Sequence, residues 1–399
     1  MFRPFLLVAL LPAIAFAQKP REHALKLPIG GTPGPLNAIT DVAGVEVGHT
    51  TLISGSGRLQ VGKGPVRTGV TVVHPRGKAS NDPVFGAWFT LNGNGEMTGT
   101  TWLQESGILE GPIGITNTSS VGIVRDGILM WQVGKPGLQP WGLPVVAETY
   151  DGGLNDINGF HVKAEHVAAA LDAAKGGVVQ EGAVGGGTGM VCHGFKGGIG
   201  TASRVLPAAD GGYTVGVLVQ CNYGLRRDLR IAGVPVGEEI TDLTSCFAGD
   251  AIATDDPRFR RRCSDPAGAR EDDAEAGSII VIVATNAPLL PHQLQRIVKR
   301  VSVGLARQGG FGGNSSGDIF IAFSTANAGT SAVGDSASVK MLSNAIISPL
   351  FHATAWATEA AITNALLAAE TMQGANDLRV HAMPRDRMLA AMRKYGRLP

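Results

Sequence analysis

The residue with the most promising chemistry is a serine that follows a glycine at the start of an apolar run. Gly277 and Ser278 separate a charged stretch, residues 270–275, from a β-branched run over residues 279–283. If the Gly277–Ser278 bond breaks, the freed α-amine, with an ordinary pKa of about 8, can act as a base for the serine hydroxyl. By itself the dipeptide is more typical of a loop that enters a strand, so other residues must support this chemistry.

A second serine-rich motif lies further along the chain. Residues 313–317 read Gly-Asn-Ser-Ser-Gly, which matches the G-x-S-x-G nucleophile elbow. The elbow needs a strand before it and a helix after it, whereas a predicted helix ends near Gln308 and a predicted strand begins at Asp318. The sequence therefore argues against an elbow and against an α/β-hydrolase. Ser315, Ser316 and Asp318 still form a candidate hydrogen-bonding cluster, although such residues also build simple turns.

Two more polar motifs follow apolar runs. Glu148 and Tyr150 come after one such run, and Asn222 follows a predicted strand that ends at Cys221. Polar residues at strand ends often line sites, although each motif alone is more typical of a cap or a turn. The glycine-rich residues 185–189 lack the Lys-Ser/Thr pair of a phosphate-binding loop. They predict close backbone packing or a loop that lines a site.

Composition argues against several classes of function. Charged residues make up 17% of the 399 residues, and the net charge is +1 with no basic stripe, so no nucleic-acid partner is expected. The 56 glycines are spread along the chain and predict many tight turns. No Cys-x-x-Cys or His-x-x-x-His pair is present, and the spacing of His161 and His166 misaligns them on a helix. No metal site and no cofactor are therefore predicted.

The four cysteines fall into two pairs of different surroundings. Cys246 and Cys263 bracket a polar, arginine-rich segment. These two cysteines can form a disulfide that closes the segment, or they can remain as free thiols, and the sequence does not decide between the two states. Cys192 and Cys221 stand in apolar sequence, where cysteine usually behaves as a small core residue. We therefore expect these two to pack in the core without a bond between them.

The N-terminus has the pattern of a secretory signal peptide. Arg3 precedes an apolar run over residues 5–17, which ends in Ala-Phe-Ala before Gln18. The run is shorter than the roughly 20 residues of a membrane span, and it has no cysteine for a lipid anchor. The sequence predicts that residues 1–17 are removed by a cut near Ala17–Gln18. The mature protein is expected to be periplasmic or secreted, with no membrane anchor.

Apolar runs of strand type and of helix type alternate with turn residues along the chain. Strands are predicted over residues 45–49, 69–74, 84–89, 213–221, 278–284 and 318–323. Helices are predicted over residues 161–175, 291–308, 342–372 (with a break near Pro349) and 385–395. Sheets flanked by helices without strict βαβ alternation indicate a layered α+β domain.

Five segments together resemble one enzyme family. They are residues 148–152 (Glu-Thr-Tyr-Asp-Gly), 187–190 (Gly-Thr-Gly-Met), 277–281 (Gly-Ser-Ile-Ile-Val), 284–294 (Ala-Thr-Asn-Ala-Pro-Leu-Leu-Pro-His-Gln-Leu) and 316–320 (Ser-Gly-Asp-Ile-Phe). From about Gly44 to the C-terminus the chain resembles the β-peptidyl aminopeptidases and L-aminopeptidase D-amidase/D-esterases. The resemblance implies a four-layer αββα sandwich, similar to the N-terminal-nucleophile hydrolases but connected differently.

The resemblance also implies a self-cleaving precursor. Cleavage between Gly277 and Ser278 would give an α chain, residues 18–277, and a β chain, residues 278–399, of one domain, assembled as a homotetramer of heterodimers. Ser278 resembles the nucleophile, and Asn222 is similar to the oxyanion donor. Ser316 and Asp318 resemble the pair that orients the serine hydroxyl and holds its amine. Some relatives carry the longer glutamate at the position of Asp318.

The substrate is expected to be a short peptide, amide or ester with a free amine. Glu148 resembles the carboxylate that binds the substrate's ammonium, and Tyr150 resembles a residue beside the scissile group. A carboxylate at a fixed distance from the nucleophile measures one residue from a free amine, which implies an aminopeptidase. A β-residue moves that amine by one carbon, so β-peptides, L-aminoacyl peptides and D-aminoacyl amides or esters all stay open.

Two other functions stay open. The first is an acyl transferase of related fold that resembles the ornithine acetyltransferases, although these use threonine at the cut and this chain has serine. The second is a non-catalytic exported binding protein that keeps the sandwich uncut. N-terminal sequencing distinguishes them, since processing yields a fragment that begins Ser-Ile-Ile-Val.

Overall fold

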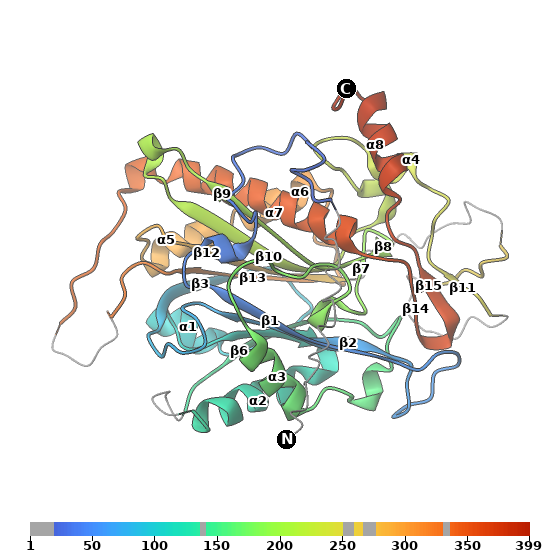
Figure 1. The fold of residues 1–399 in the computed structure, drawn as a ribbon, viewed down its shortest axis with the longest axis horizontal. Helices are drawn as coiled ribbons and strands as arrows, with labels where there is room; N and C mark the ends of the chain where they lie inside the picture. Colours follow the sequence, from blue (N-terminus) through green and yellow to red (C-terminus); the bar gives the residue numbers. More distant parts are fainter. Residues whose placement is uncertain (1–19, 136–140, 250–258, 266–276, 330–335) are drawn as a thin grey trace, which may run out of the picture.

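The fold is built around two β-sheets that pack face to face (Figure 1). The computed structural model describes residues 20–135, 141–249, 259–265, 277–329 and 336–399. The predicted leader, residues 1–17, lies outside the described residues. The larger sheet has the order β4 (Ile108–Leu109), β3 (Val84–Gly93), β13 (Gly317–Ser324), β12 (Ser278–Thr285), β10 (Thr214–Asn222) and β9 (Gly198–Val205). The smaller sheet has the order β1 (Glu46–Ser54), β2 (Val66–His74), β5 (Ile113–Asn117) and β6 (Val145–Thr149).

Helices cover the outer face of each sheet, as Figure 1 shows. The larger sheet is covered by α5 (Pro291–Val298), α6 (Val301–Arg307) and α7 (Ser348–Ala368). The smaller sheet is covered by α2 (Val121–Val133) and α3 (Ala164–Ala173). A separate apolar layer fills the space between the sheets. The predicted αββα sandwich is therefore confirmed.

The apolar run after Ser278 forms β12 because both faces of this strand are buried. Ile279, Val281 and Val283 pack toward the helices, whereas Ile280 and Ile282 pack between the sheets. A strand buried on both faces needs apolar residues at every position rather than at alternate positions. This explains why the sequence shows an unbroken β-branched run here.

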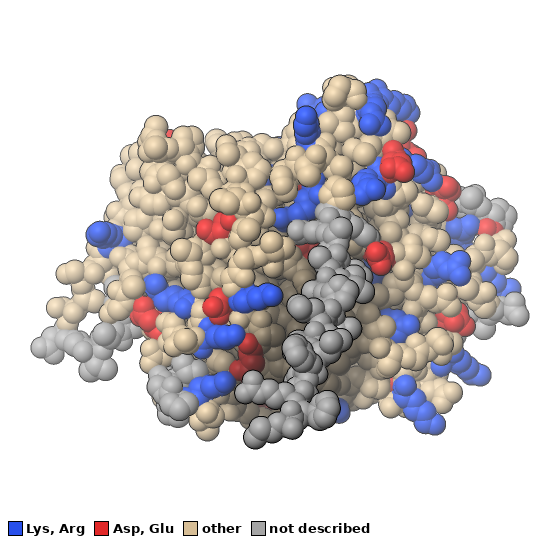
Figure 2. Space-filling model, viewed as in Figure 1, with Lys and Arg blue, Asp and Glu red and all other residues tan. Residues whose placement is uncertain are grey.

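Short elements complete the fold at its edges. They are α1 (Thr100–Ser106), the hairpin of β7 (Val191–Cys192) and β8 (Phe195–Lys196), α4 (Val236–Glu239), α8 (Arg385–Lys394), and a small sheet of β11 (Cys246–Phe247), β15 (Leu378–Val380) and β14 (Met372–Gln373). The described residues contain no helix that is long and apolar enough to cross a membrane. Basic and acidic side chains both occur across the face drawn in Figure 2.

Two helix predictions need correction. The helix predicted over residues 291–308 is two helices, α5 and α6, which are separated at Lys299 and Arg300. The stretch predicted over residues 342–372 consists of a short 3-10 helix, Asn344–Ile346, and α7, which begins at Ser348 and ends at Ala368, so the break lies at Ile347, just before Pro349. Pro349 lies in the first turn, where its missing N–H needs no partner, so it starts α7 instead of interrupting it.

The prediction for Cys192 and Cys221 was wrong, because the structure joins them in a disulfide. Both side chains are buried in the core, as their apolar surroundings indicated. The residues lie 29 positions apart, yet β7 brings their Cα atoms to 5.5 Å. Cys246 and Cys263, for which both states were open, are also joined, with a Cα–Cα distance of 4.9 Å.

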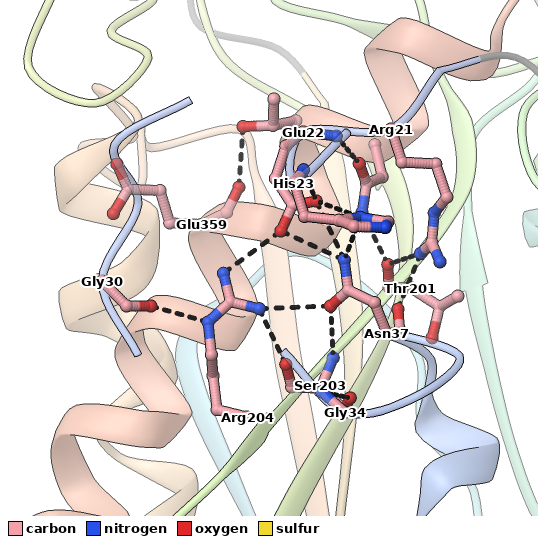
Figure 3. A network of polar contacts seen from close by, with 12 residues as sticks. Arg21, Glu22, His23, Gly30, Gly34, Asn37, Thr201, Ser203, Arg204 and Glu359 are labelled. Carbon is pink, nitrogen blue, oxygen red and sulfur yellow. Dashed lines mark hydrogen bonds and ion pairs between the residues drawn. The ribbon is translucent and has the colours of Figure 1, made fainter. Parts of the chain in front are cut away.

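A buried polar network anchors the first described residues to the larger sheet and to α7 (Figure 3). The Glu22 carboxylate pairs with Arg204 of β9 at 3.2 Å, and the Glu22 N–H donates to Asn364 of α7 at 2.9 Å. Arg21 pairs with Glu181 at 2.8 Å. All these side chains are at least nine-tenths buried. Arg21 and Glu22, close to the start of the described residues, are therefore part of the fold.

Candidate active site

Ser278 is the first residue of β12 and lies between two neighbouring strands of the larger sheet. It pairs with Asn222 at the end of antiparallel β10 and with Gly317 at the start of parallel β13. Its exposed fraction is 5%. The preceding Gly277 has no room for a side chain, since a Cβ there would lie 2.2 Å from the carbonyl oxygen of Asn222. Close packing against β10 therefore requires glycine before the serine.

The Gly317 N–H is directed at the Gly277–Ser278 junction. It donates to Ser278 Oγ at 3.1 Å and to the Gly277 carbonyl oxygen at 3.3 Å. A single main-chain donor thus contacts both the hydroxyl and the carbonyl between which an attack would occur. Sequence analysis missed this group, because a backbone N–H has no residue type by which to recognise it.

Ser316 and Asp318 flank Gly317 and are both fully buried. The Ser316 hydroxyl donates to the Asp318 carboxylate. Their position at the entry to β13 places them next to the backbone that contacts Ser278. Ser315, by contrast, is exposed, and its carbonyl accepts from the Asn94 side chain at 2.8 Å.

Both ends of the Asn222 amide are held by main-chain groups. Its Oδ1 accepts from the Val191 N–H at 2.8 Å, and its Nδ2 donates to the Tyr150 carbonyl oxygen at 3.0 Å. These bonds leave the second N–H of Nδ2 available for a further acceptor. The Tyr150 side chain is 40% exposed. Asn222 and Tyr150 are therefore brought together, beside the start of β12.

Glu148 lies near the end of β6 and is 4% exposed. Its carboxylate accepts from the Glu96 N–H at 3.1 Å and from the Thr118 hydroxyl. Burial raises the pKa of Glu148, and the two hydrogen bonds oppose this rise. A Cβ placed on Gly95 would lie 3.3 Å from Glu148 Oε1 and 3.1 Å from the Gly317 Cα. Glu148 therefore lies beside the same stretch of β13 that contacts Ser278.

A separate pocket lies away from these residues. Its lining includes His74, Trp131, Gln132 and Pro144. Pro144 immediately precedes β6, whereas Glu148 lies near its end, so the pocket and the Ser278 region occupy opposite ends of this strand. In the described part of the chain no group of three or more His, Cys, Asp or Glu side chains is placed to hold a metal ion.

The arrangement around Ser278 can support acyl transfer to a hydroxyl. A buried serine stands at a strand entry, a backbone donor faces the preceding carbonyl, and an amide side chain lies across the strand pair. A carboxylate near the same place can bind a cation. Sequence analysis predicted six residues here. The contacts above bring five of them by their side chains, and Tyr150 by its main-chain carbonyl, to one point of the larger sheet. The six residues are Glu148, Tyr150, Asn222, Ser278, Ser316 and Asp318.

Comparison with known families gives a consistent match. Residues 37–380 match the model of peptidase family S58. The chain is 53% identical over 390 residues to the β-peptidyl aminopeptidase BapA of Sphingosinicella microcystinivorans, covering 98% of this chain and 96% of the relative. It is 46% identical over 398 residues to the β-peptidyl aminopeptidase BapA of Sphingosinicella xenopeptidilytica, covering 97% and 95%.

Solved structures agree with these relatives. A β-aminopeptidase from a Burkholderia species superposes with a TM-score of 0.81 at 48% identity, covering 95% of this chain and 100% of that one. The L-aminopeptidase D-Ala-esterase/amidase of Ochrobactrum anthropi gives a TM-score of 0.83 at 43% identity, covering 96% and 100%. That structure is described as a prototype serine aminopeptidase and a new variant of the Ntn hydrolase fold.

Proposed function

The chain belongs to peptidase family S58 and is therefore a hydrolase, and from this premise we propose that it is a self-cleaving aminopeptidase with Ser278 as its nucleophile. The observation that carries the proposal is the position of Ser278, between the Gly317 N–H and the Asn222 amide at the start of β12.

Activation is cleavage of the Gly277–Ser278 bond by the serine itself. Ser278 Oγ attacks the Gly277 carbonyl carbon, the C–N bond breaks, and an ester forms while the serine nitrogen becomes a free amine. Water then hydrolyses the ester and releases the Gly277 carboxylate. The Gly317 N–H supports this step, because it already contacts the carbonyl oxygen that becomes the oxyanion. The products are residues 18–277 and 278–399.

In the mature enzyme the Ser278 amine is the base for its own hydroxyl. Ser316 and Asp318 hold this amine, since their buried pair lies beside the backbone that contacts Ser278. The free N–H of Asn222 stabilises the oxyanion of the tetrahedral intermediate, a contribution of about 3–4 kcal/mol to the transition state. The leaving amine departs, an acyl-enzyme remains on Ser278, and water releases the acid.

The substrates are short peptides, amides or esters with a free N-terminal amine. The buried Glu148 carboxylate binds the ammonium group, and the exposed Tyr150 side chain lies beside the scissile group. The relatives named for β-peptidyl substrates support β-peptides, and the Ochrobactrum neighbour named for L-peptide and D-Ala ester or amide substrates supports the wider range. Assays with β-alanyl, L-alanyl and D-alanyl amides distinguish these classes.

Export and assembly complete the proposal. Residues 1–17 act as a cleaved leader, and the mature protein acts in the periplasm or outside the cell, without a membrane anchor. The network at Arg21 and Glu22 supports a mature start near Gln18, because these two residues contact the core of the fold (Figure 3). The mature protein is a homotetramer of heterodimers, which light scattering of the processed protein tests.

One experiment tests the central step. Wild-type protein should run as two fragments, one of which begins Ser-Ile-Ile-Val, and Ser278→Ala should remain a single chain without aminopeptidase activity. Ser315→Ala is the matched control, since this exposed serine is three residues from Asp318 and has no proposed role. A Ser278→Ala protein that still splits at residue 277 refutes the nucleophile assignment. An uncut but active wild type refutes the need for activation.

A further inference from the structure

Lys196 is a fully buried lysine with no role in the steps above. It lies on β8, and its Nζ donates to the carbonyl oxygens of Met190 at 2.8 Å, Gly197 at 2.8 Å and Gly187 at 3.4 Å. Only the protonated amine has three N–H donors for three carbonyl acceptors. Burial lowers the pKa of Lys196, and the charge of Asp151 opposes this effect. The set of acceptors thus favours a retained ammonium ion at this place.

The Met190–Val191 peptide group connects Lys196 to Asn222 through hydrogen bonds. The Met190 C=O and the Val191 N–H are the two ends of one peptide group. Lys196 donates to the oxygen end, and the nitrogen end donates to Asn222 Oδ1 at 2.8 Å. Lys196, one peptide group and the Asn222 amide therefore form a continuous chain of hydrogen bonds.

This series of hydrogen bonds ends at the Asn222 N–H that we assign to the oxyanion. A cation that withdraws electron density from the Met190 oxygen makes the Val191 N–H a stronger donor. That donor in turn polarises the Asn222 amide and strengthens the donation from its nitrogen, as hydrogen bonds in series do at low dielectric. The charge-assisted bond from Lys196 also fixes the direction of the Val191 N–H.

The surrounding backbone holds both Val191 and Asn222 in place. The Cys192–Cys221 disulfide joins the residue after Val191 to the residue before Asn222. The His193 N–H donates to the Tyr223 carbonyl oxygen at 2.7 Å, on the other side of the disulfide. The β7–β8 hairpin and the end of β10 therefore form one fixed unit, which can hold the Asn222 amide in a single orientation.

We propose that Lys196 is a positioning residue, which orients and polarises Asn222 as the oxyanion donor through the Met190–Val191 peptide group. The proposal rests on the proposed function, since it needs Asn222 to act on the oxyanion. A purely structural Lys196 would hold the glycine-rich loop without acting on the transition state. The two roles predict different effects of a Lys196 substitution on kcat and on KM. They also differ in whether that effect depends on the presence of Asn222.

The test is a double-mutant cycle with Lys196→Met and Asn222→Ala, measured on self-cleaved protein with a β-alanyl amide. Lys196→Met should lower kcat about tenfold with little change in KM, a part of the 100- to 1,000-fold loss expected for a whole oxyanion donor. In the Asn222→Ala background the same substitution should have almost no further effect on kcat. If Lys196→Met lowers kcat by the same factor with and without Asn222→Ala, the two effects are independent and the proposal is overturned.

Binding of two small ligands gives a second readout. β-Alaninal forms an adduct with Ser278 that carries an oxyanion, whereas β-alaninol does not. Lys196→Met should weaken binding of the aldehyde by the same factor as kcat and leave binding of the alcohol unchanged. Equal weakening of both ligands would indicate a structural role and overturn the proposal.

Thr149→Val is the matched control, because the Thr149 hydroxyl contacts the Met190 sulfur at 2.8 Å rather than its carbonyl. It should leave kcat within about twofold. If Lys196→Met does not yield folded, cleaved protein, Lys196→Gln replaces it in the same cycle, since glutamine is neutral but keeps an N–H donor. If Asn222→Ala alone leaves kcat unchanged, the proposed role of Asn222 fails, which is distinct from failure at Lys196.

Discussion

Glu148 combines burial with two hydrogen bonds, and this combination sets how it can bind a substrate ammonium. The carboxylate is 4% exposed, and burial raises its pKa against the opposing effect of the Thr118 hydroxyl and the Glu96 N–H. Only the ionised form attracts an ammonium group strongly. Because its pKa is raised, Glu148 takes up its proton at a higher pH than an exposed glutamate does, and substrate binding weakens as the pH falls.

KM for a β-alanyl amide should rise as the pH falls, beginning above the ordinary titration range of glutamate. Glu148→Gln should raise KM about 10- to 100-fold at neutral pH and remove this rise, since its amide does not titrate. Glu96→Gln should move the rise slightly to lower pH, because the Glu96 charge raises the pKa of Glu148. An unchanged KM in Glu148→Gln would contradict the assignment.

At the scale of elements, glycines let helices approach both sheets closely. A Cβ on Gly200 of β9 would lie 2.0 Å from the Ala361 carbonyl oxygen of α7. A Cβ on Gly48 of β1 would lie 2.0 Å from the Ala170 carbonyl oxygen of α3. The alanine-rich sequence of α7 has the same effect from the helix side, since small side chains permit a short distance between the layers. The short distance between each helix layer and its sheet therefore depends on the small size of these glycine and alanine residues.

Gly200→Ala should therefore destabilise the protein by about 1–3 kcal/mol or more, through overpacking against α7. Gly122→Ala is the control, since Gly122 lies on the exposed side of α2 and its Cβ would meet open space. Replacing this helical glycine should stabilise the protein by about 0.5–1 kcal/mol. Thermal unfolding of the two variants measures both effects. A Gly200→Ala protein as stable as the wild type would show that α7 can move away from the sheet.

At the scale of the whole molecule, the proposed cut divides the chain but not the sheet. Two strands from the β chain, β12 and β13, lie between β3 and β10 of the α chain. The network of Figure 3 adds a second connection, because Glu22 and Arg204 belong to the α chain and Asn364 to the β chain. The two products should therefore stay together after cleavage, without a covalent link in the described residues.

Loss of one buried partner from this network should weaken the whole molecule. Glu22→Ala leaves the Arg204 charge without its carboxylate, and breaking a buried pair in this way costs about 3–5 kcal/mol. The melting temperature should fall markedly, while kcat of the folded fraction stays the same. Lys394→Ala removes a partner from the exposed pair with Glu239 and should leave the melting temperature unchanged. Equal behaviour of the two variants would show that the buried network does not stabilise the fold.

Much of the architecture follows from local pattern. The β-branched run after Ser278 predicts β12, because a strand buried on both faces needs apolar residues throughout. The helical periodicity after Pro291 predicts helix, although the interruption at Lys299 and Arg300 has no sequence signal. The αββα arrangement itself was expected from the resemblance of several motifs, and not from periodicity alone.

The sequence by itself determined the Gly277–Ser278 junction, the main strands and the polar residues at strand ends, since these depend on residue type and local spacing. Only the tertiary structure decided which groups meet there. The register of β10, β12 and β13 places Asn222 and Gly317 on either side of Ser278. The Gly317 and Val191 N–H groups and the Cys192–Cys221 bond depend on pairing between distant segments, and a main-chain donor leaves no trace in residue type.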